Sequence, residues 1–140
     1  KIGEPEKSLS LKIKNKNLNF SFSPVKHEDK SGFGFVLNLD SKTIGYTSDT
    51  EYFENLSTYF KNCDILIINV IKRKHDGLIG HFTTEEVTEF LNKTKPKKAI
   101  LTHFGMELIK FGPEKEAKRI EKISGIKTIA AEDGMKIKLN

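Results

Sequence analysis

The chain has 140 residues, of which 36% are hydrophobic and 31% are charged, a composition typical of one soluble globular domain. No apolar run is long enough to cross a bilayer, and the single cysteine, Cys63, excludes an internal disulfide, so we expect a cytoplasmic protein without membrane contact. The net charge of +5 favours an anionic substrate, although it would serve solubility equally well.

We expect residues 1–140 to form a single unit. The chain opens with KIGEPEKSLS and has no initiator methionine. This opening indicates a piece of a longer protein, or a shortened form of one.

The first part of the chain predicts two antiparallel hairpins. Residues 8–14 and 18–22 alternate apolar and polar side chains, and the polar NKN between them is typical of a hairpin loop. A polar loop then leads into the strand FGFVLNL, and DSKT turns the chain into IGYT. Residues 34–47 are therefore expected to form the second hairpin.

The rest of the chain alternates helices and strands. Residues 51–61 have aromatic side chains and leucine at helical spacing, whereas DILIINVI (64–71) is an apolar run typical of a strand covered on both faces. Thr83 and Glu86 have the spacing of a capping box, KAILT predicts a further buried strand, and Pro113 begins a last helix. IKTIAA and MKIKL are expected to close the chain as strands.

This order of elements predicts an α/β fold. We expect one mixed sheet that is parallel in its middle and antiparallel in its hairpins, with about three helices on one face.

Three of the four histidines and one carboxylate fall at the ends of predicted strands. Asp49 follows IGYT, His81 lies in the loop after DILIINVI, and His103 ends KAILT. The carboxyl ends of parallel strands meet at one edge of a sheet. His27 precedes a strand that runs antiparallel to IGYT, so it is expected beside Asp49. The four side chains are therefore expected to converge.

Imidazole and carboxylate groups at such an edge suit Zn, Mn or Fe. Asp49 has two oxygens and could bridge a pair of ions that activate water. Two other interpretations stay open. The SDT around Asp49 also suits a surface turn, and an isolated histidine at a strand end is more often structural than a ligand.

The order of these motifs resembles the second half of the metallo-β-lactamase superfamily. The motifs are VKHEDKSGFGFVL, GYTSDT, GHFTTEEV, AILTHFG and a terminal DGMKIKL, and they cover residues 25–140. His81 and His103 are 22 positions apart (103 − 81), the length of one helix and one strand. The most similar branch contains the phosphonate-operon cyclic-phosphate phosphodiesterases and ribonuclease Z.

The resemblance implies the C-terminal half of an αβ/βα sandwich and a metal-dependent hydrolase, expected to act on an anionic phosphodiester, with RNA among the candidates. It implies two divalent ions, zinc first with manganese or iron as alternatives. His27 and His103 would each ligate one ion, and Asp49 would bridge them. His81 would meet the substrate phosphate and protonate the leaving oxygen.

The superfamily's HxHxDH cluster is absent from these residues and belongs in an N-terminal half. We therefore expect the chain alone to be inactive and to associate, through a bare sheet face, with that half or with a second copy. The alternative function is that of a non-catalytic scaffold, or of a remnant that binds nucleic acid.

Overall fold

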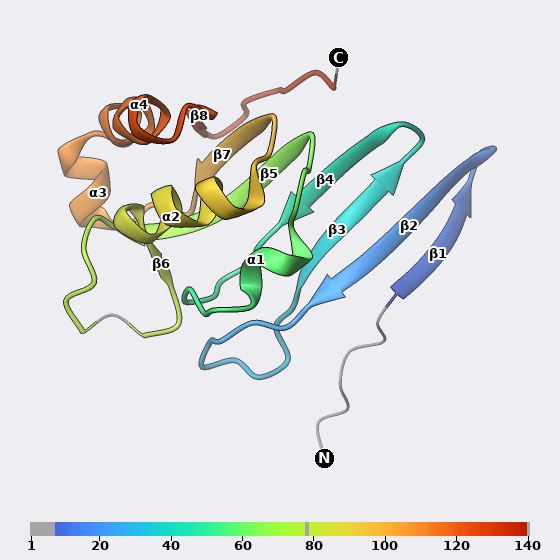
Figure 1. Ribbon diagram of the computed structural model, residues 1–140, viewed down its shortest axis with the longest axis horizontal. Helices are drawn as coiled ribbons and strands as arrows, with labels where there is room; N and C mark the ends of the chain where they lie inside the picture. The colour runs from blue at the N-terminus through green and yellow to red at the C-terminus, as the bar shows by residue number, and fades with distance from the viewer. Residues whose placement is uncertain (1–7, 78, 140) are drawn as a thin grey trace.

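The computed structural model describes residues 8–77 and 79–139 and contains one mixed sheet with helices packed against it (Figure 1). The strand order is β1-β2-β3-β4-β5-β7-β8, and β6 pairs with β5 outside this path. The strands are β1 (Ser8–Ile13), β2 (Lys16–Ser23), β3 (Gly34–Leu39), β4 (Lys42–Tyr46), β5 (Ile65–Lys72), β6 (Phe82–Thr83), β7 (Lys98–Thr102) and β8 (Lys127–Ala130). The helices are α1 (Leu56–Tyr59), α2 (Thr84–Thr94), α3 (Met106–Phe111) and α4 (Pro113–Ser124). The predicted α/β class is confirmed.

Both predicted hairpins are present and build one side of the sheet. β1 pairs with β2, β2 with β3, and β3 with β4, all in the antiparallel sense. The first hairpin turns at Lys14 and Asn15, whose φ angles are 46° and 59°, as a two-residue hairpin turn requires. The turn thus lies slightly earlier than the predicted NKN loop.

The other side of the sheet is parallel. β4 pairs with β5, β5 with β7, and β7 with β8, each in the parallel sense. Helices connect the later strands, because a parallel connection has to cross over the sheet. The carboxyl ends of β4, β5 and β7 therefore lie on one edge.

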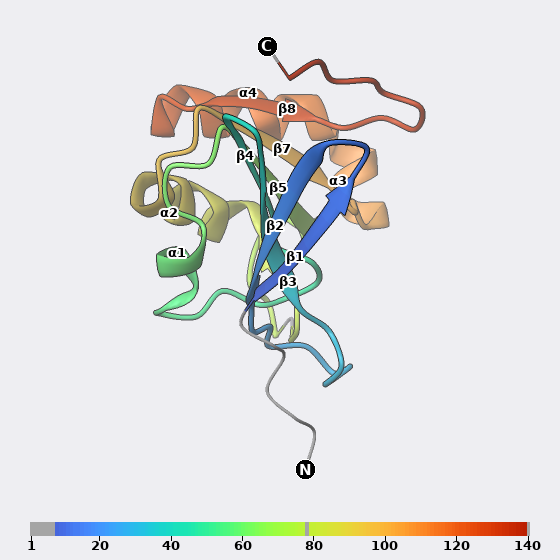
Figure 2. The same ribbon diagram turned by 90° about the vertical axis from the view of Figure 1, so that its right-hand side faces the viewer.

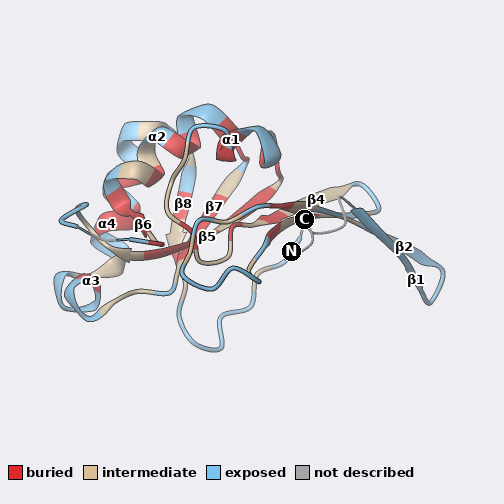
Figure 3. Ribbon diagram, turned by 90° about the horizontal axis from the view of Figure 1, so that it is seen from below, coloured by how far each residue is buried: buried red, intermediate tan, exposed pale blue. Residues whose placement is uncertain are grey.

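The core lies between this sheet and the helices. α1, α2 and α4 cover one face, as predicted (Figure 3). Phe60, Phe82 and Phe90 are fully buried there, with neighbouring ring centroids 5.1 and 6.1 Å apart. Cys63 is buried in the same core, and burial raises the pKa of its thiol to about 11. It acts as a small hydrophobic side chain.

The predicted helix over residues 51–61 is wrong in extent. Only α1, with four residues, is helical in this segment. The start of the segment is held in another conformation, because the Thr50 hydroxyl accepts the Lys26 backbone N–H at 2.9 Å and the Glu51 N–H donates to the Lys26 carbonyl at 3.0 Å. These contacts hold the chain in a loop where the periodicity predicts a helix.

The end of the chain also differs from its prediction. IKTIAA forms β8, but residues 131–139, which contain MKIKL, form no strand (Figure 2). A turn in which the Met135 N–H donates to the Glu132 carbonyl directs this segment away from β8, so it gains no strand partner. The additional helix α3 was not predicted, because only Leu108 among its six residues is buried.

The termini of the two longer helices follow the predicted chemistry. Thr83 and Glu86 form the capping box of α2. α4 begins at Pro113 and ends before Gly125, which has a left-handed φ of 71°. No helix in the described residues is long and apolar enough to cross a membrane.

A buried carboxylate joins α4 to α2 and to the residue that follows β5. Glu116 is 1% exposed, and it accepts hydrogen bonds from Arg73 at 3.1 Å, Arg119 at 3.0 Å and Thr84 at 2.8 Å. Burial alone would raise the pKa of this carboxyl, but the hydrogen bonds from Arg119 and Thr84 and the two arginine charges outweigh it and lower the pKa. Glu116 is therefore a buried anion with three partners.

Replacing Glu116 should destabilise the fold. Glu116→Gln removes the charge that holds two arginines together, and we expect a loss of about 2 kcal/mol in the free energy of unfolding. Glu114→Gln, an exposed position in the first turn of the same helix, is the matched control. Urea unfolding of both variants measures the difference, and equal midpoints would contradict a stabilising role for the network.

The sheet face opposite α1, α2 and α4 is apolar, and we call it the open face. From the side-chain alternation and the strand register, its apolar residues are Leu9, Leu11, Ile13, Leu18, Phe20, Phe22, Phe35, Leu37, Leu39, Ile44, Tyr46, Ile65, Ile67, Ile100 and Ile129, and Asn69, Lys16, Lys42, Lys98 and Lys127 share the face. Leu9, Leu11 and Ile13 are 40%, 42% and 54% exposed. Ile65 and Ile100 are buried, and most of the other apolar residues of this face are half-buried, so the exposure to water that is unfavourable is greatest on β1.

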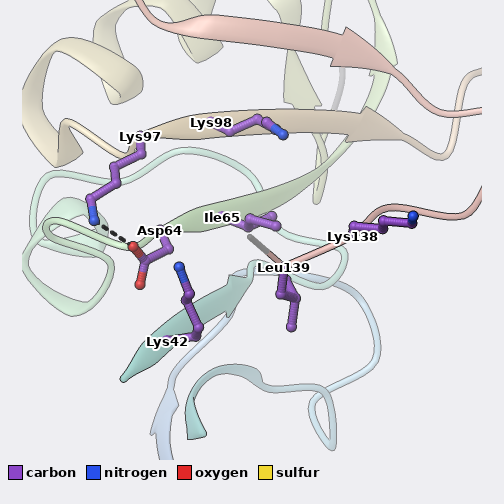
Figure 4. A pocket seen from close by; sticks show the side chains of 7 residues that line it. All are labelled: Lys42, Asp64, Ile65, Lys97, Lys98, Lys138 and Leu139. Atoms are coloured by element: carbon purple, nitrogen blue, oxygen red, sulfur yellow. Dashed lines mark ion pairs between the residues drawn. The ribbon is translucent and has the colours of Figure 1, made fainter. Parts of the chain in front are cut away.

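A pocket of about 170 Å³ lies at the amino ends of β5 and β7 (Figure 4). It is lined by Lys42, Asp64, Ile65, Lys97, Lys98, Lys138 and Leu139. Lys97 pairs with Asp64 at 2.7 Å, whereas the ammonium groups of Lys98 and Lys138 point away from Asp64 (Figure 4). Lys42 also extends toward Asp64, so the carboxylate of Asp64 already faces two of the pocket's cations (Figure 4). The candidate metal ligands lie at the other edge of the sheet.

Candidate metal centre

Four chemistry-bearing side chains meet at the carboxyl edge of the sheet. His27 lies in the loop between β2 and β3, Asp49 follows β4, His81 precedes β6, and His103 follows β7. β4, β5 and β7 are parallel, and β2 runs in the same direction as β4 because both are antiparallel to β3. The topology therefore brings all four segments to one edge.

The four side chains are close enough to share a ligand. Possible ligand atoms of His27, Asp49 and His81 all lie within 4.8 Å of one another. His103 Nε2 lies 3.4 Å from Asp49 Oδ1. The His81 ring centroid is 5.0 Å from that of His27 and 5.7 Å from that of His103. His81 thus lies between the two histidines expected to be metal ligands.

The backbone adopts an uncommon conformation just after two of the strands, β4 and β7. Ser48, directly before Asp49, has φ 59°, and His103 has φ 64°. Left-handed backbone costs a residue other than glycine about 1–2 kcal/mol. Such residues concentrate at functional sites, where the surrounding structure holds them in place.

Backbone contacts tie the His27 loop to the Asp49 loop. The Lys26 N–H donates to the Thr50 hydroxyl, and the Glu51 N–H donates to the Lys26 carbonyl. The His27 ring is oriented further by the Asp29 N–H, which donates to its Nδ1 at 3.1 Å. The start of the segment predicted as a helix, at residue 51, therefore belongs to the loop that builds this site.

Gly80 allows the His81 loop to pass close to His27. Its φ is 78°, and a Cβ at this position would lie 3.1 Å from His27 Cδ2. The Gly80 N–H donates to Glu51 Oε2 at 3.3 Å. A larger residue would be strained here and would displace the His27 ring.

The pKa of His81 is lowered. Burial is the main cause, the charges of His27 and His103 act in the same direction, and Asp49 opposes them. A lowered pKa leaves the imidazole neutral at pH 7, the form that ligates metals. The direction of this pKa shift therefore favours a ligand or a proton acceptor, because a proton donor would have to be protonated when the substrate is bound.

Asn69, which the sequence interpretation did not single out, also contacts Asp49. Its Nδ2 donates to Asp49 Oδ1 at 2.7 Å and to the Tyr46 hydroxyl at 3.0 Å. Its signal in the sequence is one amide within the otherwise apolar strand segment ILIINVI. A lone polar residue in a buried strand has to find a partner, and here that partner is the candidate ligand.

The residues fit part of a metal centre. Neutral imidazoles and a carboxylate are suitable ligands for zinc. Three imidazoles and one two-oxygen carboxylate offer at most five ligand atoms, whereas two tetrahedral ions take about eight positions, or fewer where a ligand bridges them. A two-ion centre would therefore need further ligands from outside these four side chains.

In this chain, the mixed sheet, the histidine–aspartate cluster at its carboxyl edge and the apolar open face together match the C-terminal half of a metallo-β-lactamase sandwich. The chain belongs to the beta-lactamase superfamily domain family, whose model matches residues 2–104. An uncharacterised protein of Methanocaldococcus jannaschii is 35% identical over 117 residues, which are 82% of this chain and 43% of that protein. The resemblance inferred from the motifs is confirmed.

Solved structures show the same fold. YhfI of Bacillus subtilis, a metallo-beta-lactamase fold protein, superposes with a TM-score of 0.76 at 20% identity, over 91% of this chain and 51% of that one. The short form of human tRNase Z superposes with a TM-score of 0.68 at 18% identity, over 96% of this chain and 48% of that one. The chain spans about half the length of these proteins.

Proposed function

We propose that the full-length protein containing this chain is a metal-dependent hydrolase that cleaves phosphodiesters. The observation that carries the proposal is the meeting of three imidazoles and one carboxylate at the carboxyl edge, with His103 Nε2 3.4 Å from Asp49 Oδ1. Membership of the superfamily and the fold likeness to tRNase Z support the reaction class.

In this proposal, His27 and His103 would each hold one of two divalent ions, with zinc the first choice and manganese or iron as alternatives. Asp49 would contribute its carboxylate to both ions. When bound, the ions would polarise the phosphoryl oxygens and lower the pKa of water. Asp49 and His103 would hold the ions in place, because β4 and β7 fix the backbone that carries these two side chains.

His81 acts on the substrate. Its ring lies between those of His27 and His103 and is partly buried. It is carried by the loop at Gly80, in the connection between β5 and α2, and not by a strand. From there its imidazole would donate a proton to the leaving oxygen.

RNA is the substrate class we propose first, because the chain carries a net charge of +5 and shares its fold with tRNase Z. In the basic loop KRKHDG (72–77), two of the three cations are already engaged in ion pairs. Lys72 pairs with Asp76, and Arg73 pairs with Glu116 at 3.1 Å. Contacts to the phosphate chain would therefore have to come mainly from other lysines, or from the rest of the protein.

We also propose that the rest of the domain packs on the open face. Tyr46 is on that face, and its hydroxyl touches Asn69, which touches Asp49. The metal centre therefore lies at the rim of the open face, where a second layer could supply the missing ligands.

The isolated chain should consequently associate with itself. We expect residues 1–140, produced alone, to be dimeric or aggregated in light scattering, because its open face would be exposed. The full-length protein should not share this behaviour at the same concentration. A stable monomer of the isolated chain would contradict the proposed use of the open face.

The proposed activity is tested with the full-length protein and bis(p-nitrophenyl) phosphate. We expect turnover that a chelator abolishes and that added Zn²⁺ or Mn²⁺ restores. A protein that is folded, holds no metal and has no turnover would instead support the non-catalytic scaffold.

A further inference from the structure

We infer that Asn69 is a positioning residue that fixes the orientation of the Asp49 carboxylate for metal binding, an inference that rests on the metal centre proposed above. Asn69 lies on β5 and is 6% exposed. Its side chain donates to Asp49 Oδ1 at 2.7 Å. The contact joins a rigid central strand to a side chain on a loop.

The orientation of the Asn69 amide follows from its neighbours. A carboxylate accepts hydrogen bonds and repels another acceptor, so the amide nitrogen has to face Asp49. Its second hydrogen is donated to the Tyr46 hydroxyl at 3.0 Å. Both amide hydrogens are therefore used within this cluster.

The same orientation leaves Asn69 Oδ1 buried and without a hydrogen-bond partner among the described residues. A buried acceptor without a partner costs about 1–3 kcal/mol. A leucine or isoleucine, as elsewhere in β5, would avoid this cost. Folding alone therefore does not account for an amide here, whereas the need to hold Asp49 does.

Asn69 also supports the turn that carries Asp49. Its backbone N–H donates to the Thr47 hydroxyl at 3.3 Å, and that hydroxyl donates to the Ser48 carbonyl at 3.0 Å. Ser48 is the residue with left-handed φ directly before Asp49. One residue of β5 thus acts on both the loop and the carboxylate.

The consequence is a carboxylate with a fixed direction. With Oδ1 held by Asn69, the carboxylate has less freedom to rotate, and its remaining lone pairs keep one orientation toward His27 and His103. Outer partners that orient metal ligands in this way typically change metal affinity by about 10–100-fold when they are replaced.

The experiment compares four forms of the full-length protein: the parent, Asn69→Leu, Tyr46→Phe and Thr128→Val. Zn²⁺ affinity is measured by competition with a chelator, and the thermal unfolding of the metal-free protein is measured beside it. Tyr46→Phe removes the other acceptor of the Asn69 amide. Thr128→Val replaces another buried polar residue of the sheet, 4% exposed and on β8, and controls for a loss of packing.

We expect Asn69→Leu to weaken Zn²⁺ binding by about 10–100-fold, with a metal-free unfolding temperature close to that of Thr128→Val. Thr128→Val should bind Zn²⁺ as the parent does, and Tyr46→Phe, which leaves the Asn69–Asp49 hydrogen bond in place, should weaken binding less than Asn69→Leu does. Equal affinity of Asn69→Leu and the parent would overturn the inference and leave the metal centre standing. A parent without Zn²⁺ binding would refute the proposed centre itself.

A folding defect is separated by a second variant. If Asn69→Leu does not fold, Asn69→Ala removes the same donors without adding bulk, and the same loss of Zn²⁺ affinity is expected. If neither variant unfolds cooperatively, Asn69 serves the fold and the positioning role is wrong.

Discussion

His103→Ala and Asp49→Asn variants of the full-length protein should each lose metal, with an affinity more than about 100-fold below that of the parent. The reasoning is comparative. Replacing an outer partner of a ligand costs about 10–100-fold, so losing a ligand itself should cost more. Asp49→Asn keeps the shape of the side chain but replaces one carboxylate oxygen by an amide nitrogen, which is a poor bridge between two cations.

Metal analysis of each purified variant, beside chelator competition, measures this effect. His75→Ala is the matched control, because His75 is exposed in the loop after β5 and has no place in the proposed centre. Parent-like metal content in either His103→Ala or Asp49→Asn would refute that residue's assignment.

His81→Ala should retain metal and hydrolyse a model phosphodiester about 10²–10⁴-fold more slowly, the usual effect of losing a general acid. The expected loss is in rate, because the proposed role of His81 concerns the leaving oxygen and not the ions. Single-turnover kinetics with metal-saturated protein measure it directly.

The structure also allows a second role for His81, so the prediction for His81→Ala can fail in two ways. The compact group of possible ligand atoms contains His27, Asp49 and His81, so the same geometry allows His81 to ligate an ion. Purified His81→Ala without metal would assign it as a ligand. Parent-like turnover would leave it without a catalytic role.

The sequence was sufficient for the parts of the fold that periodicity and end signals determine. Alternation predicts β1 and β2, a continuous apolar run predicts β5, and Thr83 and Glu86 predict the start of α2. The convergence of the four candidate residues could also be predicted, because strand order and direction alone place the ends of β4, β5 and β7 on one edge.

The rest depends on contacts that lie far apart in the sequence. Residues 51–61 have helical spacing, but the bonds from Lys26 to Thr50 and Glu51 keep the start of the segment in a loop. MKIKL alternates like a strand and lacks a neighbour to pair with. The contact between Asn69 and Asp49 spans 20 positions. The only local sign of it in the sequence is one amide in an apolar run.

The most direct test of the metal centre is anomalous diffraction from crystals of the full-length protein grown with Zn²⁺, with data collected on both sides of the zinc absorption edge. The proposal predicts two anomalous peaks at the carboxyl edge, one beside His27 and one beside His103, with Asp49 between them. Zinc peaks only at other places, or an edge site without anomalous signal in a protein that binds Zn²⁺ in solution, would contradict it.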